Sequence, residues 1–362
     1  MPAPILLNPG PVTLSARVRA ALNGADLCHR EPEFAELQGR IRIQLLRVYD
    51  LDPSRYAAVL LTGSGTSAME AMLSSLGPAQ SRLLVIENGV YGERMSKIAA
   101  IHGIRSVAMT LPWGEEIDTA RLRVLLDEHQ DVSHVAMVHH ETTTGRLNRI
   151  EPVARLCRER HITLLLDGVS SFGGEELRFD DWRISACAAT ANKCLHGVPG
   201  PSFVIVRRDV LNDDNLPQRT LYLDLNTYCR EQDKGGTPFT QSVQTFYALA
   251  EALLEFGEQG GWRARQQRYA ALANQLRTGL KAVGVQPLLP DGASSVVLNS
   301  YRLPIGVSYE RLHDHLKASG FVIYSGQGSF AKSIFRVSTM GEIHAADIER
   351  LVAAVAACIQ TV

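Results

Sequence analysis

Short apolar runs recur at regular spacing between residues 57 and 206, and this spacing constrains the fold more than any other feature of the chain. The runs lie at residues 57–61, 83–86, 135–138, 163–166, 186–189 and 203–206. Segments long enough to be helices separate most of them. Short apolar runs of this kind are typical of strands that are buried on both faces of a mostly parallel sheet. The pattern therefore predicts an α/β fold.

The segments between these runs have the apolar period of amphipathic helices. We expect helices at residues 67–76, 92–102, 119–129 and 152–160. Pro152 suits an early helical position, where the missing N–H costs nothing. The alternation of strands and helices predicts helices packed on both faces of the sheet.

The pattern changes after about residue 240. Two long helical stretches, 243–256 and 262–283, are interrupted at residues 258–261 by Glu-Gln-Gly-Gly. Beyond them we expect strands at 295–303, 321–324 and 334–338 and helices at 309–319 and 345–359. The sequence thus predicts a large domain with an N-terminal segment over residues 1–258 and a smaller α+β domain over residues 259–362.

Composition narrows the possible functions. Lys and Arg total 37 against 38 for Asp and Glu, so no net charge favours nucleic acid or an anionic membrane. No stretch approaches the roughly 20 apolar residues that a membrane span needs, and the start of the chain does not have the pattern of a signal peptide. The six cysteines form no CxxC pair, which favours reduced thiols over disulfides or a zinc site. We expect a cytoplasmic protein.

A glycine-rich turn follows the first apolar run. Residues 61–68 read Leu-Thr-Gly-Ser-Gly-Thr-Ser-Ala and open a predicted helix, so free backbone N–H groups at a positive helix end can hold a phosphate. The same turn also matches the dinucleotide pattern G-x-G-x-x-A, with Glu87 about 20 residues on, where a Rossmann protein has its ribose-binding acid. An NAD-dependent oxidoreductase and a turn without any ligand both remain possible interpretations of this turn.

Two charged residues follow later strands. Asp167 ends the run 164–166, at the edge of a parallel sheet where ligands bind, although it could also only cap the next turn. Lys193 lies among small and apolar residues just after the run 186–189, where its pKa is expected to be lowered; a surface lysine in a loop is the alternative. A phosphate turn, an acid for a pyridinium nitrogen and a lysine for an aldehyde are together what pyridoxal 5'-phosphate (PLP) requires, whereas NAD needs no lysine.

Several longer motifs carry a resemblance to a known family. They are Asn-Pro-Gly-Pro at 8–11, Gly-Ser-Gly-Thr at 63–66, the run at 88–95, Glu-Thr-Thr-Thr-Gly at 141–145, the run at 167–174, Ala-Asn-Lys-Cys at 191–194 and Phe-Arg-Val at 335–337. In this order they resemble the class V, fold type I PLP-dependent aminotransferases. Within that class they are most similar to the enzymes that act on 2-aminoethylphosphonate and pyruvate.

The resemblance implies roles for individual residues. Lys193 would hold PLP as a Schiff base and move the substrate proton, and Asp167 would keep the pyridine nitrogen protonated. The phosphate would lie against Ser64, Gly65, Thr66 and Asn192. Tyr91 and Val169 would pack on the two faces of the ring, and Thr142 would lie near the phenolic oxygen. Thr240 would reach the cofactor phosphate of a neighbouring subunit, which implies a homodimer with active sites at the interface.

The resemblance also implies a substrate site and a reaction. Arg336 would grip a carboxylate or phosphonate, although an Arg in an apolar strand could instead form a structural ion pair. The role of Arg30 stays open. The amino donor would be 2-aminoethylphosphonate and the acceptor pyruvate, giving phosphonoacetaldehyde and L-alanine. An alanine:glyoxylate or serine:pyruvate activity, or a PLP-binding protein without catalysis, are the alternatives. We expect no metal site, because His139 and His140 are neighbours on a strand and point to opposite faces.

Overall fold

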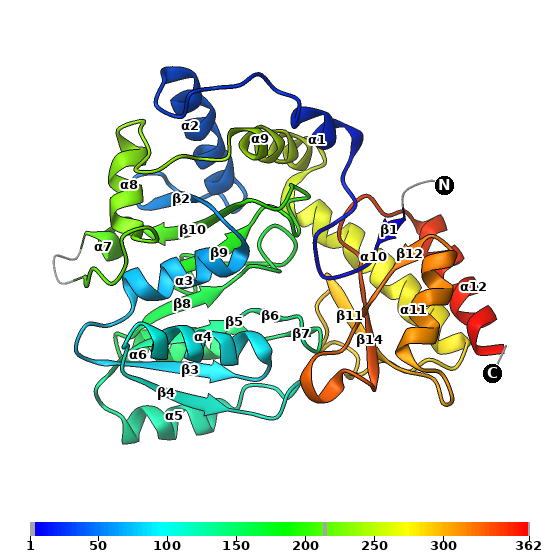
Figure 1. Cartoon of the computed structure of the whole chain (residues 1–362). Helices are drawn as coiled ribbons and strands as arrows, with labels where there is room; N and C mark the ends of the chain where they lie inside the picture. Colours follow the sequence, from blue (N-terminus) through cyan, green and yellow to red (C-terminus); the bar gives the residue numbers. More distant parts are fainter. Residues whose placement is uncertain (1–3, 213–215, 361–362) are drawn as a thin grey trace.

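A seven-stranded sheet forms the centre of the molecule. The computed structural model describes residues 4–212 and 216–360. All six strands predicted between residues 57 and 206 lie in this sheet (Figure 1). Only β10 runs antiparallel to its neighbours, and the other pairs are parallel. The strand order is β2 (Tyr56–Thr62), β10 (Pro201–Arg207), β9 (Ile184–Thr190), β8 (Thr163–Asp167), β5 (Val132–Val138), β3 (Arg82–Glu87) and β4 (Ser106–Thr110).

The edge strand β4 was not predicted from the sequence. Ser106, Ala108 and Thr110 are exposed and only Met109 is fully buried, so the segment has no apolar run to mark it. A strand at the edge of a sheet is covered on fewer sides than a central one, and polar residues are tolerated there.

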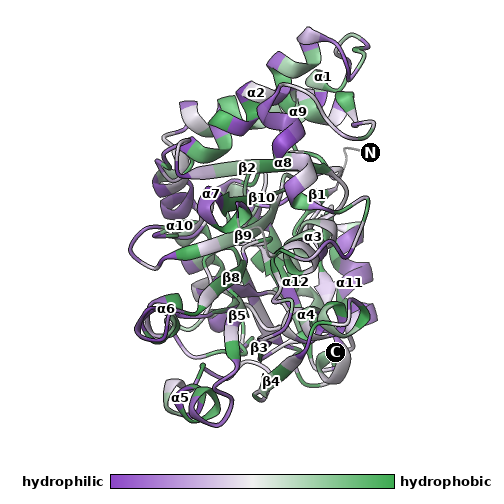
Figure 2. Cartoon of the chain, turned by 90° about the vertical axis from the view of Figure 1, so that its left-hand side faces the viewer, coloured by the Kyte–Doolittle hydropathy of each residue, from purple (hydrophilic) through white to green (hydrophobic). Residues whose placement is uncertain are grey.

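Helices cover both faces of this sheet, as predicted. Figure 2 shows α5 (Thr119–Glu128) and α6 (Ile150–Glu159) on one side and α3 (Gly65–Leu76) and α4 (Val90–Ile101) on the other. Alternate residues of β2 belong to different core clusters: Ala58 and Leu60 pack on one side, and Val59 on the other. This alternation follows from the two-residue period of a strand, and burial on both sides explains the unbroken apolar runs.

Five more helices surround the large sheet. The helix α2 (Pro32–Arg47), which was not predicted, begins with a proline at its first positions and packs on β2 and α9. The remaining four are α1 (Ala16–Ala21), α7 (Arg208–Leu211), α8 (Leu225–Asp233) and α9 (Val243–Glu258).

The C-terminal part forms a smaller α+β unit. Its antiparallel sheet has the order β11 (Leu298–Arg302), β14 (Ile334–Ser338) and β13 (Tyr324–Ser325), and its helices are α10 (Gly261–Ala282), α11 (Tyr309–Ala318), α12 (Ala345–Gln360) and the short η1 (Gly328–Phe330). The predicted strand at 321–324 is divided into β12 (Phe321–Val322) and β13. The small hairpin of β6 (His140–Glu141) and β7 (Arg146–Leu147) lies apart from both sheets.

The N-terminal segment contacts this smaller unit. The strand β1 (Ile5–Leu6) pairs in parallel with β12, and Leu7 belongs to the same core cluster as residues of α10, α11 and α12. The division of the chain at residues 258 and 259 remains a prediction. All six cysteines are free. Within residues 4–212 and 216–360, no helix combines the length and the apolar character needed to cross a membrane.

Candidate active site

Asp167 lies at the carboxyl end of the central strand β8. Its carboxyl group is buried, and one oxygen accepts a hydrogen bond from the Val169 N–H at 2.9 Å. Burial raises the pKa of Asp167 to about 6, while the Val169 N–H and the charges of Arg94 and Lys193 oppose this rise. A buried carboxylate of this kind gains stability from a positive partner.

Lys193 follows β9, the strand beside β8. Burial lowers the pKa of Lys193 to about 8; the nearby Cys194 and Asp167 oppose this, and the positive Arg336 adds to it. Because this pKa lies well below the ordinary lysine value, a larger fraction of the amine is uncharged near neutral pH and able to act as a nucleophile. Lys193 and Asp167 are close enough that each shifts the pKa of the other.

The N-terminal loop lies directly against this lysine. The Lys193 Nζ donates a hydrogen bond to the carbonyl oxygen of Pro9. A Cβ atom on Gly10 would lie 2.8 Å from Nζ, and the φ angle of Gly10 is +115°, which other residues rarely adopt. Residues 8–11 are one of the motifs that carry the family resemblance, but their contact with Lys193 was not predicted.

The glycine-rich turn meets both of these strands. Gly65 is the first residue of α3, and a Cβ there would lie 2.6 Å from Val169 and 3.4 Å from Thr190. Ser64 is exposed, and its side chain makes no capping hydrogen bond, so the helix N–H groups keep their capacity for a ligand. Thr190 donates a hydrogen bond to Asn192 at 2.9 Å. The structure thus brings Ser64, Gly65, Val169 and Asn192 together.

Tyr91 and Thr66 are joined by a residue that the sequence analysis assigned no role. The Arg94 guanidinium lies 4.7 Å from the centre of the Tyr91 ring and donates a hydrogen bond to the Thr66 hydroxyl at 3.2 Å. Its charge also lowers the pKa of Asp167. The spacing of three residues between Tyr91 and Arg94 on α4 places both side chains on one face, which could have identified this pair.

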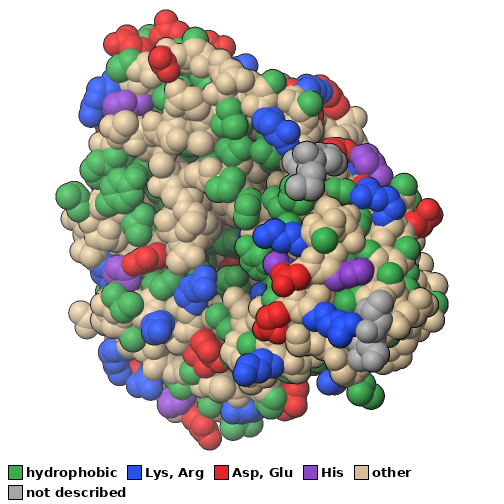
Figure 3. All heavy atoms as spheres, turned by 45° about the vertical axis from the view of Figure 1, so that its right-hand side comes forward, with side chains coloured by type: hydrophobic (Ala, Val, Ile, Leu, Met, Phe, Trp, Pro, Cys, Tyr) green, Lys and Arg blue, Asp and Glu red, His purple; other side chains and the backbone are tan. Residues whose placement is uncertain are grey.

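Arg336 reaches the site from β14 of the smaller unit. Its guanidinium is buried and donates hydrogen bonds to the backbone oxygens of Ser325 and Thr142, each at 2.9 Å. Among the described residues no carboxylate pairs with it, so the expected alternative of a structural ion pair is not found. The Thr142 hydroxyl is buried and has no hydrogen-bond partner in the described part of the chain. The surface is hollowed where the large and small parts meet (Figure 3).

Other predicted residues lie differently. Thr240 is exposed, and no hydrogen bond of the described residues joins it to this group. The neighbours His139 and His140 are both buried, and their ring nitrogens lie 3.0 Å from the Ser171 hydroxyl and 3.4 Å from the Ser170 carbonyl oxygen, respectively. Glu87 accepts a hydrogen bond from the Thr110 hydroxyl at 2.9 Å.

Comparison with known proteins identifies the family. The family model described as aminotransferase class V matches residues 51–351. This chain belongs to the class V aminotransferases. It is therefore a PLP-dependent enzyme of fold type I, and the dinucleotide interpretation of the 63–68 turn is not retained.

Individual relatives of this aminotransferase cover nearly all of the chain. A 2-aminoethylphosphonate–pyruvate transaminase from Aeromonas hydrophila is 38% identical over 97% of this chain and 94% of that protein. A bifunctional phosphonoacetaldehyde hydrolase/aminoethylphosphonate transaminase from Clostridioides difficile is 35% identical over 96% of this chain, which spans only 55% of that protein. The crystal structure of an alanine–glyoxylate aminotransferase from Nostoc sp. has a TM-score of 0.92 and 27% identity, and covers 99% of this chain and 96% of its own.

The residues present fit PLP. The unpartnered Thr142 hydroxyl needs a polar ligand atom, and the buried Asp167 carboxyl needs a positive one. The start of α3 offers free N–H groups, and Lys193 offers an amine of lowered pKa. A polar group, an anion, a set of free N–H groups and an amine are together the kinds of group that PLP requires of its site.

Proposed function

We propose that this enzyme transfers the amino group of 2-aminoethylphosphonate to pyruvate, producing phosphonoacetaldehyde and L-alanine. The observation that carries this proposal is the buried Arg336 guanidinium, which is held by backbone oxygens and keeps its charge for a substrate. Relatives that are 2-aminoethylphosphonate–pyruvate transaminases, at 35–38% identity, supply the substrate pair.

One cation suits both half-reactions. The donor carries a phosphonate and the acceptor a carboxylate, and a guanidinium binds either group through two parallel hydrogen bonds. Backbone oxygens fix the Arg336 side chain without neutralising it. Each substrate in turn would then be held by its anionic group, with its reacting carbon near Lys193.

Lys193 would act as the proton carrier. When bound, PLP supplies an electron sink that makes the carbon bearing the amino group acidic. In each half-reaction the free Lys193 amine would carry a proton between the substrate carbon that bears the nitrogen and the C4′ atom of the cofactor. Its lowered pKa keeps part of the amine uncharged near neutral pH, as this task requires. Asp167 would hold the proton on the ring nitrogen by its negative charge.

The remaining residues would bind and orient the cofactor. Ser64, Gly65, Thr66 and Asn192 are assigned to the phosphate, and Tyr91 and Val169 to the two faces of the ring. Thr142 is assigned to the phenolic oxygen. We further propose that Thr240 of one subunit completes the phosphate site of the other in a homodimer, and that the enzyme works in the cytoplasm, where its six free thiols stay reduced.

A single-turnover experiment tests the donor. The purified holoenzyme is mixed with 2-aminoethylphosphonate, and pyruvate is added later. The absorbance of the bound cofactor near the edge of the visible range is followed throughout. We expect this absorbance to fall with 2-aminoethylphosphonate and to return with pyruvate. Serine is tested in parallel, and a faster fall with serine than with 2-aminoethylphosphonate would replace the proposed donor. L-Alanine does not discriminate, because it is the product of the proposed second half-reaction and should lower the absorbance by its reversal.

Two variants test the assigned roles. Lys193→Ala should remove the absorbance of covalently held cofactor and stop turnover, and Asp167→Ala should retain the fold but slow turnover by several orders of magnitude. An unchanged spectrum and rate in Lys193→Ala, or full activity in Asp167→Ala, would refute the corresponding role.

A further inference from the structure

A second cavity lies at the opposite edge of the central sheet from Asp167. It encloses about 240 Å³ and is bordered by the end of α6, the starts of β8 and β9 and the end of β10. Thr163 lines this cavity and begins β8, whereas Asp167 ends it. At roughly 3.3 Å per residue the two ends of this strand are about 13 Å apart. The cavity is therefore separate from the proposed substrate site.

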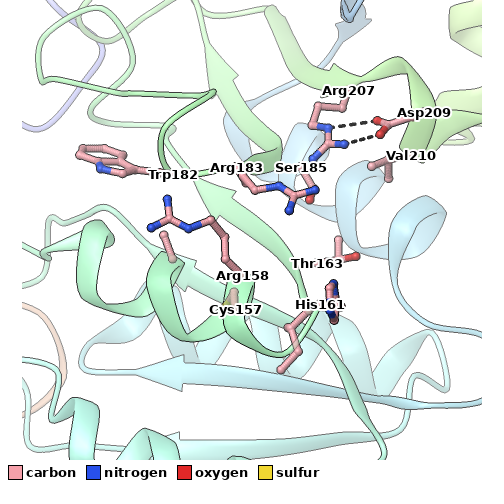
Figure 4. A pocket seen from close by; sticks show the side chains of 12 residues that line it. Cys157, Arg158, His161, Thr163, Trp182, Arg183, Ser185, Arg207, Asp209 and Val210 are labelled. Carbon is pink, nitrogen blue, oxygen red and sulfur yellow. Dashed lines mark hydrogen bonds and ion pairs between the residues drawn. The ribbon is translucent and has the colours of Figure 1, made fainter.

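The charges around this cavity are unbalanced. Figure 4 shows Arg158 extending from α6, Arg183 from the turn before β9 and Arg207 from the end of β10. Arg207 pairs with Asp209, the one carboxylate in the lining. Arg158 donates only to the backbone carbonyl of Asp181. The Arg183 backbone N–H donates to the Asp180 carbonyl oxygen at 3.1 Å, but its guanidinium has no hydrogen bond or ion pair with any residue of the ranges 4–212 and 216–360. Arg158 and Arg183, which are both exposed, thus have no carboxylate partner in the lining.

Backbone conformation singles out two of the lining residues. Four non-glycine residues of the described chain have φ angles in the left-handed region, namely Asp50, His161, Arg183 and His196. His161, at φ 55°, and Arg183, at φ 46°, both line this cavity. A Cβ atom is unfavourable in that region, and glycine is the usual choice there. His161 closes the end of α6, and histidine is enriched at positive φ angles. Arg183 instead stands where glycine would give a more stable backbone, which indicates that its side chain is useful.

The cavity also offers hydrogen-bond donors. Ser185 is only 5% exposed and lines the cavity. No residue in the described part of the chain hydrogen-bonds its hydroxyl. The Thr163 hydroxyl lies in the same lining, and the Trp182 ring forms part of the wall. Guanidinium groups together with hydroxyl donors make a set that matches the oxygens of a tetrahedral anion.

We propose that this cavity binds a phosphate or phosphonate group that carries two negative charges. Arg183 and Arg158 supply the charge, and Ser185 and Thr163 supply neutral donors. Such an anion can come from free phosphate or from a small phosphorylated or phosphonate-bearing metabolite. The proposal concerns a second site and does not depend on the amino donor of the enzyme.

Inorganic phosphate is a suitable probe. The holoenzyme is used so that the cofactor phosphate fills its own site, and the Arg336→Met background removes the proposed substrate cation. Calorimetric titration at constant ionic strength, with chloride as the balancing anion, should still detect phosphate binding in this background. Adding Arg183→Gly should weaken that binding about tenfold or more, since a charge-assisted hydrogen bond to the anion is lost. Arg158→Gln should weaken it in the same direction.

The glycine variant gives a second, independent signature. Because glycine suits a positive φ angle, Arg183→Gly should unfold at the same or a higher temperature than the parent in the absence of phosphate. Asp50→Gly is the matched control, since Asp50 is exposed, has a φ angle of 55° and does not line this cavity. It should not change phosphate binding. Undiminished phosphate binding in both Arg183→Gly and Arg158→Gln would overturn the proposal, as would a lower unfolding temperature of Arg183→Gly, which would assign Arg183 a structural role.

Discussion

Charged neighbours shift the pKa of the Lys193 amine in opposite directions. Its pKa is lowered to about 8, mainly by burial; the Arg336 charge contributes to this lowering and the Asp167 charge opposes it. Only the uncharged amine attacks an aldehyde, so the rate at which the apoenzyme takes up PLP should rise with pH and reach half its maximum near pH 8.

Variants should move this midpoint in opposite directions. Arg336→Met removes a positive charge and should shift the midpoint to higher pH, whereas Asp167→Asn removes a negative charge and should shift it to lower pH. The measurement is the rate of absorbance change on mixing apoenzyme with PLP at a series of pH values. A common midpoint in all three proteins would mean that these charges do not act on Lys193.

Gly10 tests whether the N-terminal loop helps to shape the lysine site. Gly10→Ala would bring a Cβ atom within 2.8 Å of Lys193 Nζ. It should lower both the free energy of unfolding, by about 1–3 kcal/mol, and the fraction of enzyme that holds cofactor. Gly284→Ala is the control, because Gly284 also has a positive φ angle but no atom lies within 4 Å of the added carbon. Equal cofactor content in the two variants would remove the loop from the site.

For single residues, the sequence predicted which side chains lie at the sheet edge but not which other groups they contact there. Lys193, Asp167 and Arg336 follow or lie in apolar strands, so their burial and proximity to a sheet edge were readable from the sequence. The Pro9 carbonyl that accepts the lysine hydrogen bond has no side-chain signature, and it comes from a segment 184 residues away. Arg94 acts through a contact with Thr66 on another helix, which local spacing does not reveal.

The helix α10 connects the smaller unit to the loop that carries Lys193. Arg265 is buried on this helix and donates hydrogen bonds to the Cys194 carbonyl oxygen at 2.6 Å and to Gln259 at 2.7 Å. Arg265→Met would leave the buried Cys194 oxygen without this donor. We expect it to reduce the free energy of unfolding by about 2 kcal/mol.

Chemical denaturation measures this effect. Gln267 lies on the same helix and is exposed, so Gln267→Met is the control. It should change the free energy of unfolding by less than about 0.5 kcal/mol. If Arg265→Met and Gln267→Met unfold at the same denaturant concentration, Arg265 does not hold the lysine loop to α10.

Elements with an unbroken apolar run or a clear helical period were predicted to within a few residues. The strand β14 was predicted with its observed bounds, Ile334–Ser338, because all five of its residues are buried. The edge strand β4 was not predicted because its exposed residues are polar or small and break the apolar run. The two-residue strands β12 and β13 were predicted as one strand because a single residue separates them. Their separation depends on β1 and β14, which pair with different halves of that segment.

For the whole molecule, the order of layers could be predicted and long-range docking could not. Alternating strands and helices predicted the α/β/α arrangement, and the change of period near residue 240 predicted a second unit. The pairing of β1 with β12 joins residues more than 300 positions apart, and neither segment has a pattern that selects the other.

The proposed homodimer can be tested by making two inactive chains complement each other. Thr240 is exposed within one chain, so its side chain is free to contact the cofactor phosphate of a second subunit that lies against that surface. Thr240→Asp would place a negative charge beside the phosphate and should inactivate the site to which residue 240 contributes, as Lys193→Ala inactivates its own. In a mixed dimer of these two variants, one site then combines an intact Lys193 with an intact Thr240 from the other chain. Random pairing of equal amounts after refolding should restore about one quarter of the wild-type activity. If Thr240 served its own chain, each site of the mixed dimer would carry one defect, and the mixture would stay inactive.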